Sequence, residues 1–373
     1  MKILYVYEHM TLYGGVERIF IEKMNYLVNF FHEEVFFLTY NQGQHPMPFK
    51  LNEKVRYTDL EVMTFRSYYY HGVRRLWDKH RRSVQLKKKL RDYILKLNPD
   101  IIVTTTIGPI KHLLRLKGNF RLIIESHGGY DHVIDCTTNS FFDRCRYSLQ
   151  KNRIKKADCL VSLTEGDANL WRTIHHHVVV IPNFIHLNES GSFSTLDNKK
   201  VIFAGRLDKL KAIPDIVEIW KLVNKRHPDW RLEMYGKGMY DNYLKEVVEK
   251  EILNIRCHPP VPNIYSQMVD CSIIILASYY ESFGLVIGEA MSCGLPVVAF
   301  NCPFGPAEII TDGKDGFLIE NRDKATFANK ICLLIENREM RQRMGQAAIK
   351  SVQRYRPEDI MPMWKELFES MMV

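Results

Sequence analysis

Residues 273–300 of the chain read IIILASYYESFGLVIGEAMSCGLPVVAF, and this stretch decides the fold class. It opens with four consecutive branched aliphatic residues, passes through a turn that contains Gly284, continues as a helix and returns to an apolar run that starts at Pro296. Continuous apolar strands separated by a helix are typical of parallel sheets that are covered on both faces. The stretch therefore predicts an α/β fold.

The same alternation extends from this stretch toward both ends of the chain. Two series of short apolar runs, separated by helical patterns or polar loops, lie on either side of residue 199. Two such series predict two doubly wound, Rossmann-like domains, each with its own parallel sheet. The predicted strands are residues 3–7, 35–38, 101–103, 122–124, 160–161 and 178–181 in the first series, and 201–204, 232–235, 255–257, 273–276, 296–300 and 317–319 in the second.

The boundary between the domains is expected in the stretch HLNESGSFSTLDNK, residues 186–199, which is polar and shows no periodicity. We assign residues 1–190 to the first domain and residues 191–355 to the second. Residues 356–373 carry apolar side chains at helical spacing. They predict a last helix that packs back on the first domain through Met363, Trp364 and Phe368.

The composition is that of a soluble globular protein. The 373 residues are 46% hydrophobic and 25% charged, and no uninterrupted apolar run approaches the ~18 residues that would span a bilayer. The start, MKILYVYEHM, reads as a strand and not as a signal peptide. The eight cysteines form no C-x-x-C pair, so a zinc site or a redox dithiol has little support and buried free thiols are expected.

The excess of positive charge is confined to one segment. The chain carries a net charge of +9, and residues 66–96 alone hold eleven Lys or Arg against two Asp. The remainder of the chain is balanced. This segment is therefore expected to meet an anionic surface.

Loops at the carboxyl ends of parallel strands are the candidate sites, because open sheets bind ligands there. In the first domain, Gly14 and Gly15 follow the first strand and open a helix, whose free N–H groups suit a phosphate. His127 follows the strand that contains residues 122–124 and could donate a hydrogen bond or transfer a proton. A plain turn and a structural histidine are the alternatives. No G-x-G-x-x-G is present, which disfavours a dinucleotide oxidoreductase.

In the second domain, Arg206 and Lys211 follow the first strand and suit a diphosphate. A solvated basic loop is the alternative. The helix that starts near residue 285 should direct the backbone N–H groups of Phe283, Gly284 and Leu285 toward a negative group.

Two glutamates flank the same turn. Glu289 lies one to two turns inside the helix among apolar residues, where its carboxylate can accept both vicinal hydroxyls of a ribose. Glu281 precedes the turn and can reach the hydroxyls of a sugar beyond the phosphate.

Taken in order, the motifs Gly205-Arg206-x4-Lys211, Glu281-x7-Glu289 and Gly294-Leu-Pro-Val297 make the chain resemble the family-4 retaining glycosyltransferases, which have the GT-B fold. The resemblance covers nearly the whole chain and is strongest from residue 201 to residue 319. It implies that the first domain is the acceptor side and that the second binds the nucleotide-sugar donor. The family's usual Lys-Gly is Lys211-Ala212 here, and Ser282 stands where Glu-Gly-Phe-Gly has glycine, so altered loop detail with retained activity is expected.

The resemblance also implies a role for each candidate residue. Two cations hold the donor diphosphate in place of the metal ion used by other glycosyltransferase folds, so no metal and no cofactor besides the donor substrate is expected. The implied roles are diphosphate binding for Arg206 and Lys211, ribose binding for Glu289, contact with the donor sugar for Glu281, a place at the reaction centre for His127 and a phosphate-side lining for Gly15.

The expected function is a hexosyltransferase that moves a hexose or N-acetylhexosamine from a nucleotide sugar, by default a UDP-sugar, to a glycan or glycolipid acceptor. The resemblance implies cell-surface polysaccharide or lipopolysaccharide synthesis by a cytoplasmic enzyme, peripheral on the inner face of the membrane. One alternative is a UDP-sugar epimerase of the same architecture. Another is a nucleic-acid binder that uses the aromatic and basic residues of segment 66–96, although no nucleic-acid partner is expected.

Overall fold

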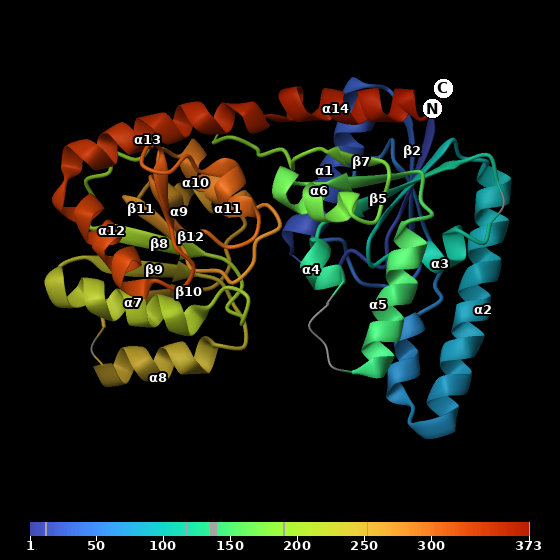
Figure 1. Ribbon diagram of the computed structural model, residues 1–373, viewed down its shortest axis with the longest axis horizontal. Coiled ribbons are helices and arrows are strands. Elements are labelled where there is room, and N and C mark those ends of the chain that lie inside the picture. Colours follow the sequence, from blue (N-terminus) through green and yellow to red (C-terminus); the bar gives the residue numbers. More distant parts are fainter. Residues whose placement is uncertain (12, 117, 135–139, 189–190, 252, 373) are drawn as a thin grey trace. The chain divides into compact units, whose positions relative to one another are not determined.

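The computed structural model describes the chain except residues 12, 117, 135–139, 189–190, 252 and 373 (Figure 1). It contains two compact units. The first comprises Met1–Ile181 together with Met361–Val373, and the second comprises Pro182–Ile360. In the described part of the chain, no helix has both the length and the apolar character needed to cross a membrane.

The first unit is built on a seven-stranded sheet in the order β3-β2-β1-β4-β5-β6-β7, in which every neighbouring pair is parallel. The strands are β1 (Lys2–Val6), β2 (Glu34–Thr39), β3 (Arg56–Asp59), β4 (Ile101–Thr105), β5 (Arg121–Ser126), β6 (Cys159–Ser162) and β7 (Val178–Val180). The helices are α1 (Gly15–Phe30), the 3₁₀ helix η1 (Thr64–Tyr69), α2 (Gly72–Leu97), α3 (Ile110–Leu113), α4 (Tyr130–Val133), α5 (Phe141–Ile154) and α6 (Glu165–Arg172).

The second unit has a six-stranded parallel sheet in the order β10-β9-β8-β11-β12-β13. Its strands are β8 (Lys200–Ala204), β9 (Arg231–Tyr235), β10 (Ile255–His258), β11 (Ile273–Leu276), β12 (Val297–Phe300) and β13 (Gly316–Ile319). The helices are α7 (Ile213–Arg226), α8 (Asp241–Glu251), α9 (Tyr265–Met268), α10 (Leu285–Ser292), α11 (Gly305–Ile309), α12 (Lys324–Glu336), α13 (Arg338–Val352), the 3₁₀ helix η2 (Gln353–Tyr355) and α14 (Pro357–Ser370).

The two sheets confirm the predicted doubly wound α/β architecture. All twelve predicted strands are present, because each is an apolar run whose side chains are largely buried between helices. The sequence analysis missed β3. Its residues, RYTD, are polar and half exposed, as suits an edge strand that pairs only with β2.

Each sheet reverses its strand order at one point. In the first unit the reversal lies between β1 and β4, and in the second between β8 and β11. Loops that leave the carboxyl ends of these strands diverge to opposite sides of the sheet, so a crevice opens where ligands bind. These two places therefore direct the search for the functional site.

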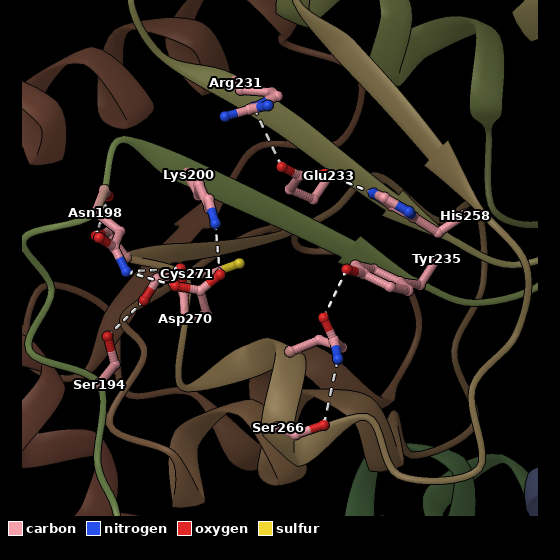
Figure 2. Close-up of polar contacts among 12 residues, drawn as sticks. Ser194, Asn198, Lys200, Arg231, Glu233, Tyr235, His258, Ser266, Asp270 and Cys271 are labelled. Carbon is pink, nitrogen blue, oxygen red and sulfur yellow. Dashed lines mark hydrogen bonds and ion pairs between the residues drawn. The ribbon is translucent and has the colours of Figure 1, made fainter.

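The break between the units lies at Ile181–Pro182, and not at residue 190 as the sequence predicted. Phe184 and Ile185 are buried in the second unit, which holds the early part of the predicted linker. Figure 2 shows how its later part is attached: Ser194 donates to the carbonyl of Cys271 at 2.5 Å, and the side chain of Asn198 donates to Asp270 at 2.7 Å. Polar composition had suggested a free segment, but these residues belong to the fold of the second unit.

The last helix begins in the second unit and belongs to the first from Met361 onward. Trp364 and Phe368 are buried there, and the Lys23 ammonium lies 3.7 Å from the centre of the Trp364 ring. The prediction for Met363 was wrong, since this side chain is 38% exposed. Met361 is buried instead, because it shares the helix face of Trp364 and Phe368 at spacings of three and seven residues.

Candidate active site

The loop after β8 carries the two predicted cations. Arg206 is 67% exposed and pairs with Asp208 at 3.1 Å. The same aspartate accepts a hydrogen bond from the backbone N–H of Lys211 at 3.1 Å, which closes the loop into a tight turn before α7. Arg206 is therefore at the surface of the carboxyl edge of the sheet, where a charged ligand can reach it.

Lys211 meets Glu281 directly. The Lys211 ammonium lies 2.5 Å from Oε1 of Glu281, and the Ser278 hydroxyl donates to the same oxygen at 2.6 Å. Lys211 follows β8 and Glu281 follows β11, the two strands between which the sheet order reverses. The structure thus brings together two predicted site residues that lie 70 positions apart in the sequence.

The turn between β11 and α10 is built for close approach of backbone. Gly284 precedes the helix with φ +93°, a conformation that L-residues with a side chain rarely adopt. The Phe283 ring is buried against Tyr355, with centroids 5.3 Å apart, so its side chain anchors the turn. Gly305 packs on the carbonyl of Phe283, where a Cβ atom would lie 2.0 Å away from that oxygen.

The three predicted N–H donors of this turn are available to a ligand. In the described part of the chain, no acceptor is found for the N–H groups of Phe283, Gly284 and Leu285. Because these groups lie at the start of α10, they form an electropositive end suited to an anion. Glu289 lies in the second turn of this helix and is 8% exposed.

Arg322 is a residue of this site that the sequence analysis missed. Its guanidinium donates to the carbonyls of Ala277 and Ser278 at 2.8 and 2.7 Å and pairs with Asp215 at 2.8 Å. It also lies 4.2 Å from the ring centre of Tyr279. Arg322 therefore fixes the carboxyl end of β11, from which the chain leads to Glu281.

Two glycines after β9 were also missed. A Cβ atom on Gly236 would lie 1.9 Å from the carbonyl oxygen of Gly205, and one on Gly238 would lie 2.3 Å from that of Leu207. Only glycine lets the two loops approach this closely. The spacing Gly236-Lys-Gly238 at the end of a predicted strand was the signal that could have revealed them.

Aromatic rings continue this edge toward β10. Tyr235 and His258 stack with centroids 4.5 Å apart, and Figure 2 shows Glu233 between His258 and Arg231, at 2.6 Å and 3.2 Å. The Tyr235 hydroxyl donates to Gln267 of α9 at 2.8 Å. The sequence analysis gave neither ring a role.

In the first unit, the predicted residues lie at the carboxyl edge of the other sheet. Gly15 is the exposed first residue of α1, and Gly14 is its N-cap. His127 follows β5 and is 8% exposed. Its Nε2 lies 2.9 Å from Oε2 of Glu125, so the imidazole donates this N–H to the carboxylate.

A buried ion pair supports His127. The Lys23 ammonium lies 2.5 Å from the same oxygen of Glu125, and neither residue is more than 1% exposed. Burial by itself would raise the pKa of Glu125, but the charge of Lys23 and the hydrogen bonds from His127 and Lys23 hold it below its ordinary value. Burial lowers the pKa of Lys23 in spite of the opposing charge of Glu125. Lys23 and Glu125 are positioning residues that the sequence analysis did not identify.

The predicted residues therefore form two groups, one on each unit. Lys211 and Glu281 touch, and Arg206, Phe283, Gly284, Leu285 and Glu289 lie on the loops and helix around them. Gly15 and His127 belong to the first unit.

The comparisons with known proteins follow the same division. The model of "Glycosyltransferase Family 4" matches residues 13–189, and the model of "Glycosyl transferases group 1" matches residues 188–351. Together the two matches span most of the chain. The chain belongs to glycosyltransferase family 4. This glycosyltransferase has the GT-B fold, as the two parallel-sheet units and the solved structures below establish.

Individual relatives agree with this assignment. An uncharacterized glycosyltransferase of Haemophilus influenzae is 26% identical over 94% of this chain and 95% of its own length. The poly(ribitol-phosphate) alpha-N-acetylglucosaminyltransferase of Staphylococcus aureus is 30% identical over 52% of this chain and 40% of its own length. The crystal structure of TarM from S. aureus superposes with a TM-score of 0.78 at 16% identity, over 98% of this chain and 99% of that one.

Proposed function

We propose that this glycosyltransferase moves a hexose or an N-acetylhexosamine from a UDP-sugar to a glycan or lipid-linked acceptor during synthesis of a cell-surface polysaccharide or lipopolysaccharide. The transfer proceeds with retention at the anomeric carbon and without a metal ion. The contact between Lys211 and Glu281, beside the free N–H groups that open α10, carries this proposal. It unites a cation, a carboxylate and an anion-binding helix start at one sheet edge, which are the groups that a sugar diphosphate requires.

The relatives support the choice of donor and acceptor class. The S. aureus relative is named for N-acetylglucosamine transfer to poly(ribitol-phosphate), and a Bacillus subtilis relative, 26% identical over 75% of this chain, is a poly(glycerol-phosphate) alpha-glucosyltransferase. The TarM structure holds UDP and alpha-GlcNAc-glycerol. A UDP-sugar and an acceptor of the cell surface fit these names.

In the proposed reaction, negative charge grows on the leaving diphosphate as the bond to the anomeric carbon breaks. Arg206, Lys211 and the N–H groups at the start of α10 stabilise that charge, because they are in place before the reaction begins. Glu289 binds the ribose hydroxyls. Glu281, held by Lys211 and Ser278, contacts the donor sugar.

A donor screen tests the proposal. The protein is incubated with UDP-, GDP- and ADP-sugars, with and without EDTA, and slow release of free nucleotide is measured. We expect release from a UDP-sugar that survives EDTA and is largely lost in Arg206→Ala, while the control Arg343→Ala, an exposed arginine of α13, retains it. Absence of release from every donor contradicts the proposed activity, and strict dependence on Mg²⁺ or Mn²⁺ contradicts the metal-free mechanism.

We also propose that the protein is peripheral on the inner face of the cell membrane, docked through the start of α2. There, five exposed apolar or aromatic side chains stand among arginines; this docking surface consists of Tyr68, Tyr69, Val73, Leu76 and Trp77 with Arg74, Arg75 and Arg81. Arg75 lies 4.8 Å from the ring centre of Tyr68 and Arg81 lies 5.6 Å from that of Trp77. Exposed aromatic residues among cations suit the interface of an anionic membrane.

The rest of α2 explains why its start is exposed. Leu86, Leu90 and Ile94 are buried on the first unit, so the second half of the helix belongs to the core. Figure 1 shows that the first turns of α2 and α5 lie at the same end of this unit. Helix α5 begins there with Phe141 and Phe142, which are 67% and 84% exposed.

Arg82 does not belong to the docking surface, although its neighbours do. It donates to the buried Asp78 at 2.6 Å and to the carbonyl of Val62 at 2.8 Å. Its replacement would leave both acceptors unpaired and would confuse docking with folding. Each remaining cation near an anionic leaflet contributes about 1 kcal/mol.

Vesicle sedimentation tests the docking surface. The triple variant Arg74→Gln, Arg75→Gln, Arg81→Gln should pellet less than the wild type with acidic phospholipid at low salt. The charge-matched control changes Lys225, Lys245 and Lys250, which are exposed on the second unit, to Gln. Equal sedimentation of all three proteins would show that the surface is not used, and binding of RNA in place of vesicles would favour the nucleic-acid alternative.

A further inference from the structure

A cavity of about 420 Å³ lies in the first unit, apart from His127 and Gly15. Its wall is formed by the loop after β1, by η1 and α2, and by α3, which follows β4. Strands β1 and β4 are the pair at which the sheet order reverses, so the cavity occupies the place where such sheets bind ligands. Its volume suits a small ligand or one group of a larger one.

The wall of the cavity is rich in basic side chains. Lys79 and His80 come from α2, and Lys111 and His112 come from α3. In the described part of the chain, neither lysine forms an ion pair with a carboxylate. The acidic residue on the wall is Glu8, whose carboxylate accepts a hydrogen bond from Asn41 at 2.7 Å.

Polar atoms inside the cavity are loosely connected. The Lys111 ammonium lies 3.4 Å from the hydroxyl oxygen of Ser83, and this oxygen lies 3.4 Å from Nε2 of His112. His112 is 7% exposed, and its other ring nitrogen, Nδ1, has no hydrogen-bond partner among the described residues. Unsatisfied buried polar atoms of this kind are uncommon unless a ligand or water completes them.

The electrostatics of the cavity agree with this geometry. Burial, followed by the charges of Lys111, Arg115, Lys87 and Arg153, lowers the pKa of His112 to about 4. Burial and the charges of Arg153, Arg115 and Lys79 also lower the pKa of Lys111. The basic groups of α2, α3 and α5 therefore repel one another around the cavity, and a bound anion would relieve that repulsion.

We infer that this cavity binds a phosphate group of the acceptor, with Lys79 and Lys111 as cationic ligands and Ser83 and His112 as hydrogen-bond partners. Calling the ligand an acceptor rests on the proposed function, whereas the binding of phosphate does not. Glu8 on the same wall suits a sugar or polyol hydroxyl next to the phosphate. Tyr68 and Leu76 line the cavity and also belong to the docking surface, so a lipid attached to the phosphate would leave toward the membrane.

Calorimetric titration with inorganic pyrophosphate, without donor, tests the site. We expect Lys111→Gln and Lys79→Gln each to weaken binding at least tenfold, while the control Lys88→Gln, an exposed lysine of α2 outside the cavity, binds as the wild type. Because a diphosphate could also occupy the donor site, the titration is repeated with Arg206→Ala. Binding that is lost in Arg206→Ala but kept in Lys111→Gln overturns the inference.

His112 provides a second measurement that does not depend on lysine substitutions. Bound pyrophosphate should raise the pKa of His112 from about 4 toward its ordinary value of 6.5, which is followed by NMR of the imidazole. A His112 titration that is unaffected by pyrophosphate overturns the inference.

Two organic phosphates identify the source of the group. Competition by sn-glycerol 1-phosphate supports the phosphate of a polyol-phosphate chain, and competition by farnesyl diphosphate supports a lipid-linked acceptor. If neither competes, the assignment to an acceptor is overturned. If no nucleotide sugar is turned over but the lysine variants still lose pyrophosphate, the proposed function fails and the phosphate site stands.

Discussion

The ion pair between Lys23 and Glu125 should be a main determinant of the stability of the first unit. We predict that Lys23→Met lowers its free energy of unfolding by about 3–5 kcal/mol, because it leaves the carboxylate of Glu125 buried without a counter-charge. The residue pair is almost completely buried, so water cannot replace the lost ammonium. For a unit of this size the loss corresponds to a fall in Tm of ~6–20 °C, measured by differential scanning calorimetry.

The double variant Lys23→Met, Glu125→Gln separates charge from packing. It removes both charges and should recover most of the lost stability, whereas the surface control Lys54→Met should stay within about 0.5 kcal/mol of the wild type. Because the pKa of Glu125 lies below its ordinary value of 4.5, the pair stabilises the fold fully above that pH and loses its effect as the pH falls through the folded-state value. Scans are therefore made at pH 7. If Lys23→Met is as stable as Lys54→Met, the reasoning is refuted.

Three further predictions follow from single residues. Glu289→Ala should weaken UDP binding at least tenfold by calorimetry, because hydrogen bonds to a charged group are worth about 1.5–3 kcal/mol each; unchanged affinity, equal to that of the exposed control Glu249→Ala, would contradict its role. Ala212 has φ +51°, so Ala212→Gly should raise the free energy of unfolding by up to about 1 kcal/mol, whereas Ala347→Gly within α13 should lower it by a similar amount; a loss in both would argue against strain at Ala212. His112 stays neutral in the folded protein until about pH 4 while the unfolded chain takes up its proton near pH 6.5, so stability is full above pH 6.5 and should fall by about 2 kcal/mol between pH 7 and pH 5 in urea titrations. His112→Gln should lose less over the same range, and an equal loss would contradict the assignment.

The sequence was sufficient for the framework of the fold because its signals are local. An apolar run such as residues 273–276 must be buried on both faces, and only a covered parallel sheet provides that environment. Strand β3 escaped prediction because an edge strand is exposed and needs no apolar run. The limit of the first unit was misplaced because polarity did not reveal that Ile185 is buried in the second unit.

The site was partly predictable for a related reason. Residues such as Arg206 and Gly284 follow directly on strands, so their place at a carboxyl edge can be derived from the order of the elements alone. Glu281 was placed in the same way, but its contact with Lys211 depends on β8 and β11 being neighbours in the sheet, which the linear order of the strands does not state.

By itself, then, the sequence determined that this protein has two parallel sheets, which loops leave their carboxyl ends, and where its positive charge is concentrated. Only the tertiary structure decided the partners of those residues. Lys23 and Glu125 are 102 positions apart, and the cavity gathers Lys79 and His112 from different helices. Strand and helix patterns arise from neighbours along the chain, whereas a buried charge or a ligand site depends on side chains that meet only after the sheet has ordered its strands.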